Sequence, residues 1–235
     1  MTAKTNRLWI IPGIFFLLAC CVNLYGCASD NLLVERYVKG ALMPLLALTG
    51  LAFLAPRKFD TRIAGTLLLA QLFGWAGDSL LLGSGFAWFA TGIGFFMLGH
   101  VCYICLFCRS LKGLSAGKWI VAAVVMAAML TGVVVAIGIK GVLLAPMALY
   151  GGELLVISFC GLCGICRRWD PSRGVWGLVL LGGLLFLFSD SLIAMRTFDE
   201  GYFAWRGFVI MLTYLAAQSL LCAAAVKIAI TKDPA

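Results

Sequence analysis

The stretch Gly74-Trp75-Ala76-Gly77-Asp78-Ser79-Leu80-Leu81-Leu82 places a carboxylate inside an apolar segment, Gly65–Gly83, that is long enough to cross a lipid bilayer. A charged side chain at the centre of a spanning helix costs about 2.5–3.5 kcal/mol on insertion scales, so such residues usually face a protein interior or a water-filled cavity. A second stretch, Phe188-Ser189-Asp190-Ser191-Leu192-Ile193, repeats the Asp-Ser-Leu feature downstream. We therefore expect the fold to bring these two aspartates near each other.

The overall composition indicates a helical membrane protein. Of the 235 residues, 63% are hydrophobic and only 12% are charged, whereas a soluble domain carries about 25% charged residues. Long apolar runs alternate with short basic loops. This pattern favours an all-α bundle of membrane helices over a β-barrel, whose strands would alternate polar and apolar residues. The net charge of +8 comes from residues between the runs, so we expect no nucleic-acid partner.

The apolar runs predict eight transmembrane helices within a single membrane domain, residues 1–235. Most runs approach the roughly 20 residues that cross the hydrocarbon. The first run also resembles a signal peptide that ends at Leu24-Tyr25-Gly26-Cys27, but it is long for a signal and we favour a retained helix. The predicted spans are Leu8–Cys27, Val38–Ala55, Gly65–Gly83, Ala87–Cys108, Trp119–Ile139, Val142–Ile165, Val175–Met195 and Phe208–Ile230.

The basic residues predict an orientation. With eight spans, 13 of the 18 Lys and Arg residues fall on the side of the membrane that holds both termini. Because Lys and Arg are enriched in cytoplasmic loops, we expect both termini in the cytoplasm. The expected location is a bacterial inner membrane.

A weak internal repeat divides the predicted spans into two halves, approximately residues 8–108 and 119–230. Lys39–Leu48 opens the second span and Lys140–Leu149 opens the sixth, and one inserted residue aligns the two segments. The Asp-Ser-Leu elements then fall in the third and seventh spans, which cross the membrane in the same direction. This pattern predicts two parallel four-helix halves, although apolar segments also resemble one another by chance.

Nearly all of the ten cysteines lie inside the predicted spans. Two groups are spaced at three-residue steps: Cys102, Cys105 and Cys108, and Cys160, Cys163 and Cys166. Thiolates at such spacing can hold an iron–sulfur cluster, but cluster motifs lie in loops. In a membrane helix a cysteine more often packs as a small apolar side chain. We therefore expect no metal and no cofactor.

Three acids and the only histidine lie inside the spans: Asp78, His100, Glu153 and Asp190. Both aspartates are about five residues from the non-cytoplasmic end of their spans, roughly 8 Å below that surface. Helical spacing groups further polar residues on shared faces, which are His100 with Tyr103, Tyr150 with Glu153, Tyr214 with Gln218, and Gln71 and Trp75 with Asp78. We expect these faces to line an interior pocket. The alternative is a set of inter-helix hydrogen bonds worth about 0.6 kcal/mol each.

Six short motifs follow one another from the second predicted span to the last. They are Lys-x4-Pro (Lys39, Pro44), Gly-Asp-Ser-Leu-Leu-Leu (Gly77–Leu82), Phe-x2-Gly-His-x2-Tyr (Phe96, Gly99, His100, Tyr103), Pro-x3-Tyr (Pro146, Tyr150), Phe-x-Phe-Ser-Asp-Ser-Leu-Ile-Ala (Phe186–Ala194) and Tyr-x3-Gln-x-Leu (Tyr214, Gln218, Leu220). In this order they resemble the YhhN family of eight-span, lysoplasmalogenase-like membrane proteins. The resemblance implies cleavage of the vinyl ether bond of lysoplasmalogens to a fatty aldehyde and a glycerophospho-base. Gly151-Gly152-Glu153 departs from the pattern, because apolar residues are expected there.

Two carboxyl groups suit this chemistry. A carboxylic acid in apolar surroundings can protonate the β-carbon, and an ionised carboxylate can stabilise the oxocarbenium ion and activate water. We predict that Asp78 and Asp190 form this catalytic pair, with the acid unassigned, and that His100 orients one of them or the water. Lys39 either meets the lipid phosphate or anchors its helix. The other predicted substrate-binding residues are Tyr103, Tyr150, Glu153, Ser189, Tyr214 and Gln218.

Two other functions are considered. A metal hydrolase commonly has three protein ligands to its metal, often histidines, and this chain has one histidine. A proton-coupled transporter of lipids or small molecules fits repeated halves and membrane carboxylates equally well. For the hydrolase we expect a lysophospholipid substrate and contact with membrane lipid. The head group, the chain length and the oligomeric state are not predicted.

Overall fold

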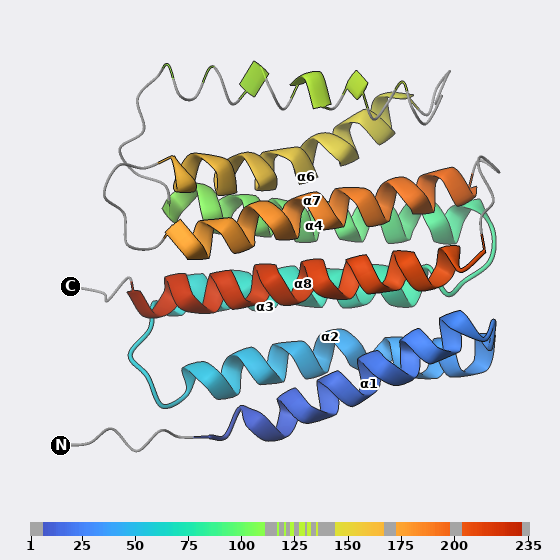
Figure 1. The fold of residues 1–235 in the computed structure, drawn as a ribbon, viewed down its shortest axis with the longest axis horizontal. Helices are drawn as coiled ribbons and strands as arrows, with labels where there is room; N and C mark the ends of the chain where they lie inside the picture. Colours follow the sequence, from blue (N-terminus) through green and yellow to red (C-terminus); the bar gives the residue numbers. More distant parts are fainter. Residues whose placement is uncertain are drawn as a thin grey trace. The chain divides into compact units, whose positions relative to one another are not determined.

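The computed structural model describes residues 7–110, 144–166, 173–197 and 204–231, together with helical residues 117, 120, 123–124, 127–129, 131–132 and 135. These residues form helices and turns and no strand, which confirms the all-α prediction for this part of the chain. The helices labelled in Figure 1 are α1 (Ile10–Ala28), α2 (Leu32–Leu54), α3 (Thr61–Leu80), α4 (Phe86–Ser110), α6 (Leu144–Ile165), α7 (Arg173–Thr197) and α8 (Arg206–Thr231).

Among these helices, six are long and apolar enough to cross a membrane, namely α1, α2, α4, α6, α7 and α8. The protein is therefore a multi-pass integral membrane protein. The remaining helix, α3, covers most of the predicted third span, but Gln71 and Asp78 lower the hydropathy of its C-terminal half. The predicted fifth span, Trp119–Ile139, lies largely outside the described residues. Eight transmembrane helices thus stay a prediction.

The chain forms two compact units. Unit 1 comprises residues 1–102 and 225–235, and unit 2 comprises residues 103–224. Both boundaries fall inside helices, one in α4 and the other in α8. The predicted single domain and its internal repeat stay predictions.

The turn between α1 and α2, in unit 1, satisfies the backbone at both helix ends. Asp30 has a left-handed φ of 52°, and the N–H of Asn31 donates to Gly26 O at 2.9 Å, which is the long bond of a Schellman motif. The Asn31 side chain accepts a hydrogen bond from Val34 N at 3.3 Å and thereby caps α2. This cap starts α2 six residues before the predicted span, which begins at Val38.

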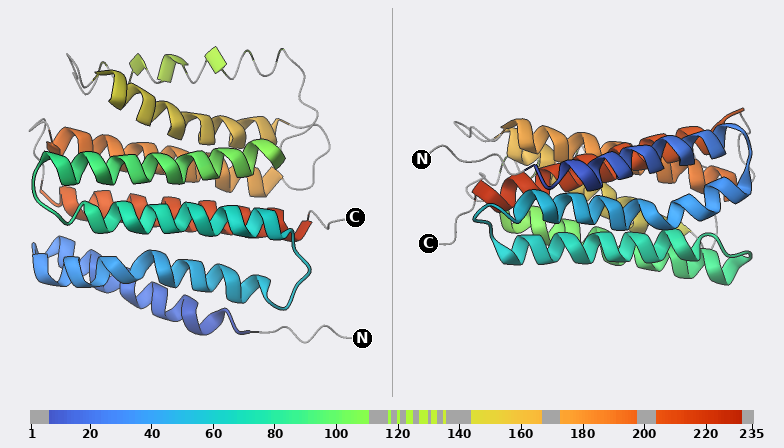
Figure 2. Two further views of the ribbon diagram at one scale, coloured as in Figure 1. Left: turned by 180° about the vertical axis from the view of Figure 1, so that it is seen from behind. Right: turned by 90° about the horizontal axis from the view of Figure 1, so that it is seen from below.

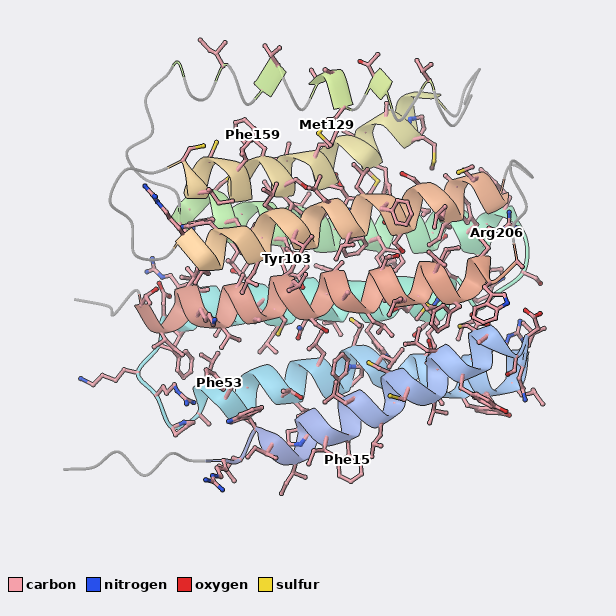
Figure 3. The ribbon with its side chains drawn as sticks, viewed as in Figure 1. Phe15, Phe53, Tyr103, Met129, Phe159 and Arg206 are labelled. Carbon is pink, nitrogen blue, oxygen red and sulfur yellow. The ribbon has the colours of Figure 1, made fainter. Side chains whose placement is uncertain are left out.

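In unit 1, α2 packs against both α1 and α3, as the views in Figure 2 show. Asn23 on the inner face of α1 is fully buried and donates to Glu35 O at 3.3 Å. Phe15 lies on the opposite face of α1, directed away from α2 (Figure 3), and 58% of it is exposed. A large apolar side chain on the outer face is expected for a helix that contacts lipid.

Glycines allow α3 and α4 to approach closely. A Cβ at Gly77 would lie 2.7 Å from the Phe96 ring, and one at Gly99 would lie 3.1 Å from Ala70 O. Small residues at such crossings are typical of membrane helices, because they let two backbones come together. These contacts set Phe96 beside Gly77, the residue that precedes Asp78.

Glycines also determine how α6 packs on α7 in unit 2. A Cβ at Gly183 would collide with Ser158, one at Gly161 with the Leu180 backbone, and one at Gly164 with the Trp176 ring. Each turn along α6 therefore meets the preceding turn of α7, as antiparallel helices require. The register of the two helices is fixed over three successive contacts.

We predict that Gly161→Ala lowers the stability of the protein, because its Cβ would meet the Leu180 backbone and push α6 away from α7. Overpacking of this kind costs roughly 1–3 kcal/mol. Gly177→Ala on α7 is the matched control, since a Cβ there has nothing within 4 Å. It should be neutral or stabilise the helix by up to about 1 kcal/mol. Thermal unfolding in detergent measures both variants, and equal midpoints would contradict the predicted clash.

Candidate functional site

The aspartate of unit 1 forms an ion pair across two helices. Lys39 Nζ on α2 lies 3.4 Å from Asp78 Oδ1 on α3, and the two side chains are 12% and 3% exposed. Charged residues inside membrane segments commonly pair with one another, because hydrocarbon offers no other partner. Two predicted site residues are thus direct neighbours, and the choice between phosphate binding and anchoring for Lys39 stays a prediction.

Asp78 lies in the last turn of α3, closer to the helix end than the sequence predicts. The helix ends at Leu80 rather than at Gly83, and Gly85 in the following turn has a φ of 97° that favours glycine. A helix C-terminus carries partial negative charge and disfavours a carboxylate. Two cations offset this effect: Lys39 pairs with Asp78, and Arg36 Nη2 donates to Leu82 O at 3.1 Å.

A third contact between α2 and α3 follows from a proline inside α2. Pro44 has no N–H, so the carbonyl of Gly40, four residues earlier, has no helical donor. The indole Nε1–H of Trp75 donates to this Gly40 carbonyl at 2.9 Å. Gly40 follows Lys39 directly, and Trp75 is one helical turn before Asp78. The bond therefore holds α2 and α3 in the register that places Lys39 next to Asp78.

His100 is buried on α4 and stacks on Phe96, with ring centroids 6.5 Å apart and an interplanar angle of 29°. Its neighbour Gly99 lies against Ala70 and Gly74 of α3. His100 is consequently level with the turn of α3 that precedes the ion pair, as is Gln71 on the buried face of that helix. His100 and Asp78 therefore lie at successive turns along the α3–α4 helix pair.

Gln71 is a further polar residue of this interior. Only 2% of it is exposed, and neither Nε2 nor Oε1 makes a hydrogen bond within the described part of the structure. An amide without partners in a membrane interior is costly. Gln71 and Asp78 are seven residues apart, so they occupy the same angular position on α3 about 10 Å apart along the axis. The buried face of α3 is therefore polar over its last two turns.

The aspartate of unit 2 has a different partner. Tyr150 on α6 donates its hydroxyl hydrogen to Asp190 Oδ2 on α7. The glycine contacts between α6 and α7 predict this meeting, because the same antiparallel register continues from Gly161 and Leu180 to Tyr150 and Asp190. Glu153 is half-buried one turn after Tyr150 on α6. Two predicted site residues are again direct neighbours.

The other predicted residues of unit 2 bond helices to one another. Tyr103 Oη donates to Gln218 Oε1 at 2.9 Å, and both side chains are buried (Tyr103 is labelled in Figure 3). Ser189 Oγ donates to Ile210 O at 3.0 Å, so its hydroxyl ties α7 to α8. Tyr214 meets Phe186 edge-on, with centroids 5.4 Å apart. The first two contacts match the alternative interpretation of membrane polar residues as inter-helix hydrogen bonds.

The structure thus brings predicted residues together within each unit. Asp78 belongs to unit 1 and Asp190 to unit 2, and their predicted action as one pair stays a prediction. Arg36 is not among the predicted residues. Gln71 and Trp75 are predicted to share the pocket face of Asp78; Gln71 is buried as expected, but Trp75 is 39% exposed. A signal for Trp75 exists in the sequence, because a proline inside α2 requires a donor for Gly40 O from another helix.

The described part of the chain holds no cluster of metal-binding side chains. Among the described residues, no group of three or more His, Cys, Asp or Glu side chains lies close enough to hold a metal ion. The described members of the two cysteine groups form no disulfide with one another.

Apolar helices with paired polar groups between them define a multi-pass membrane protein with a polar interior. The chain belongs to the YhhN family, whose family model matches residues 34–225, from α2 into α8. No curated protein and no solved structure matches the chain.

We predict that Trp75→Phe lowers stability by about 1 kcal/mol, because it removes one hydrogen-bond donor and leaves Gly40 O without a partner while keeping an aromatic ring. Trp88→Phe is the matched control, since both tryptophans are exposed, 39% for Trp75 and 51% for Trp88, and of the two it is Trp75 whose indole donates to a carbonyl of another helix. Chemical or thermal unfolding in detergent compares the two variants. A Trp75→Phe protein as stable as the Trp88→Phe protein would show that the indole bond contributes nothing.

Proposed function

We propose that this YhhN-family protein is a membrane hydrolase that cleaves the vinyl ether bond of lysoplasmalogens to a fatty aldehyde and a glycerophospho-base. The observation that carries the proposal is that each membrane aspartate contacts another predicted site residue, Lys39 beside Asp78 and Tyr150 beside Asp190. Ionisable residues held in this way inside spans usually mark a functional site. Membership of the family supports the same reaction.

The proposed reaction begins when a carboxylic acid protonates the β-carbon of the vinyl ether, which gives an oxocarbenium ion. Water adds to this cation and loses a proton to a carboxylate. The resulting hemiacetal collapses to the aldehyde and the glycerophospho-alcohol. General acid–base help of this kind typically accelerates a reaction by about 10²–10⁴-fold.

We assign the carboxylate role to Asp78 and the proton donor to Asp190, because their partners differ in charge. Lys39 is a cation, and an anionic carboxylate beside it balances the charge inside the membrane segment. Tyr150 is a neutral phenol, which can bond to a carboxylic acid as well as to a carboxylate. His100, which lies one helical turn from Asp78 along α3 in unit 1, is proposed to orient the water.

Substrate binding is proposed for the remaining predicted residues of each unit. Lys39 has three donors, so it can meet the lipid phosphate as well as Asp78. The proposed pocket walls are Tyr103, Tyr150, Glu153, Ser189, Tyr214 and Gln218.

The proposed topology places both termini in the cytoplasm of a bacterial cell, with the chain in its inner membrane. The excess of Lys and Arg on that side supports this orientation. Reporter fusions at the two ends measure it: a reporter that is active only in the cytoplasm should work at both.

We predict that Asp78→Asn and Asp190→Asn each lower aldehyde release by about 100-fold or more, because each removes one acid–base group. Purified protein in detergent is given a lysophospholipid with a vinyl ether chain, and the aldehyde is measured by mass spectrometry. Asp30→Asn is the control, since Asp30 is exposed and asparagine tolerates its φ of 52°. Full activity in both Asp78→Asn and Asp190→Asn would refute the mechanism. A wild-type protein that releases no aldehyde would refute the reaction.

The second candidate is a proton-coupled transporter, and the ion pair between Lys39 and Asp78 is the observation that favours it. Ionisable pairs inside spans also serve as proton or ion relays in carriers. The same aldehyde assay separates the two functions, because a carrier moves its substrate without forming a product. Uptake of the intact lipid into sealed vesicles without aldehyde would support the transporter.

A further inference from the structure

The sequence contains two cysteine groups that the proposed reaction does not use, and the structure brings one member of each into contact. Cys108 Sγ on α4 lies 3.4 Å from Cys160 Sγ on α6, within unit 2. Neither Cys108 nor Cys160 is part of a disulfide. From this contact we propose that Cys108 and Cys160 form a redox-active thiol pair, which a peroxide converts reversibly into a disulfide that joins α4 to α6.

Helix geometry explains why the two groups yield one contact rather than a cluster. Residues three apart on an α-helix differ by about 300° in direction, so three cysteines at this spacing fan out over roughly 120°. Only one of them can then point straight at a given neighbouring helix. In agreement, Cys108 meets α6, and the described residues contain no group of three metal-binding side chains.

The two thiols differ in accessibility in the way that an attacking and a resolving cysteine differ. Cys108 is exposed and lies two residues before the end of α4, where the polar residues Arg109 and Ser110 follow. Cys160 is completely buried against it. Cysteines that sense oxidants are typically accessible and placed next to a resolving thiol. A small oxidant can therefore reach Cys108 first.

The proposed chemistry has two steps. The Cys108 sulfur attacks one oxygen of hydrogen peroxide, the O–O bond breaks, and Cys108 becomes a sulfenic acid while one water leaves. The Cys160 sulfur then attacks the Cys108 sulfur, the S–O bond breaks, and a second water leaves as the S–S bond forms. Two thiols are oxidised by two electrons and one peroxide is reduced to two waters. A dithiol reductant reverses the change by thiol–disulfide exchange.

The disulfide would join two helices that carry other bonded residues. Tyr103, which bonds to Gln218, precedes Cys108 on α4, and Tyr150, which bonds to Asp190, precedes Cys160 on α6. A covalent link would prevent these helices from separating at that end. The pair is independent of the proposed vinyl ether reaction, so either can hold without the other.

The test uses the purified full-length protein in detergent. The protein is treated with a few equivalents of hydrogen peroxide, remaining thiols are blocked with a maleimide, and the mass of the intact chain gives the number of blocked cysteines. We expect the oxidised wild-type chain to lose two maleimide adducts and to regain both after dithiothreitol. Peptide mapping should find Cys108 linked to Cys160 in the same chain.

Variants and controls decide the assignment. Cys108→Ser and Cys160→Ser should each abolish the paired loss, whereas Cys105→Ser, on the same helix and exposed, should retain it. A link between other cysteines, a link between two chains, or irreversible oxidation of Cys108 without a link would overturn the proposal. The map of the wild-type chain is decisive even where a variant fails to fold.

Discussion

A charged group inside a membrane segment needs a partner from another helix, and this requirement determines how α2 lies on α3. Lys39 and Asp78 satisfy it directly, at 3.4 Å. Two flanking bonds, from Arg36 to Leu82 O and from Trp75 to Gly40 O, follow the same antiparallel register. The three contacts also supply what the local sequence lacks, namely positive charge at the end of α3 and a donor for the carbonyl that Pro44 leaves unbonded.

In unit 2, close packing at glycines determines how α6 lies on α7. Gly161, Gly164 and Gly183 remove the side chains that would hold α6 and α7 apart, and each is opposed by a larger group on the other helix. Van der Waals contact and hydrogen bonds replace the hydrophobic effect as the source of helix association in lipid. The short distance between backbones is what lets a tyrosine on α6 reach an aspartate on α7.

Much of this arrangement can be predicted from the sequence, because apolar length and polar spacing are local properties. The helical class, most of the helix positions and the buried state of Asp78, His100 and Gln218 follow from them. Which helix supplies the partner of each polar residue cannot be predicted in this way, because it depends on the rotation and depth of two helices at once. The end of α3 is a similar case: the apolar run continues through Leu81 and Leu82, but the chain turns at Gly83-Ser84-Gly85. The common action of Asp78 and Asp190 depends on long-range packing of the same kind.

The bond from Trp75 to Gly40 makes two distant positions interdependent. With another residue in place of Pro44, the N–H of residue 44 would donate to the Gly40 carbonyl. The hydrogen bond from Trp75 would then no longer be needed. Without the tryptophan, the proline alone would leave α2 free to bend at its weakest point. The effects of changing residues 44 and 75 should therefore not add. An engineer who wishes to straighten or loosen this helix must choose the residues at both positions together.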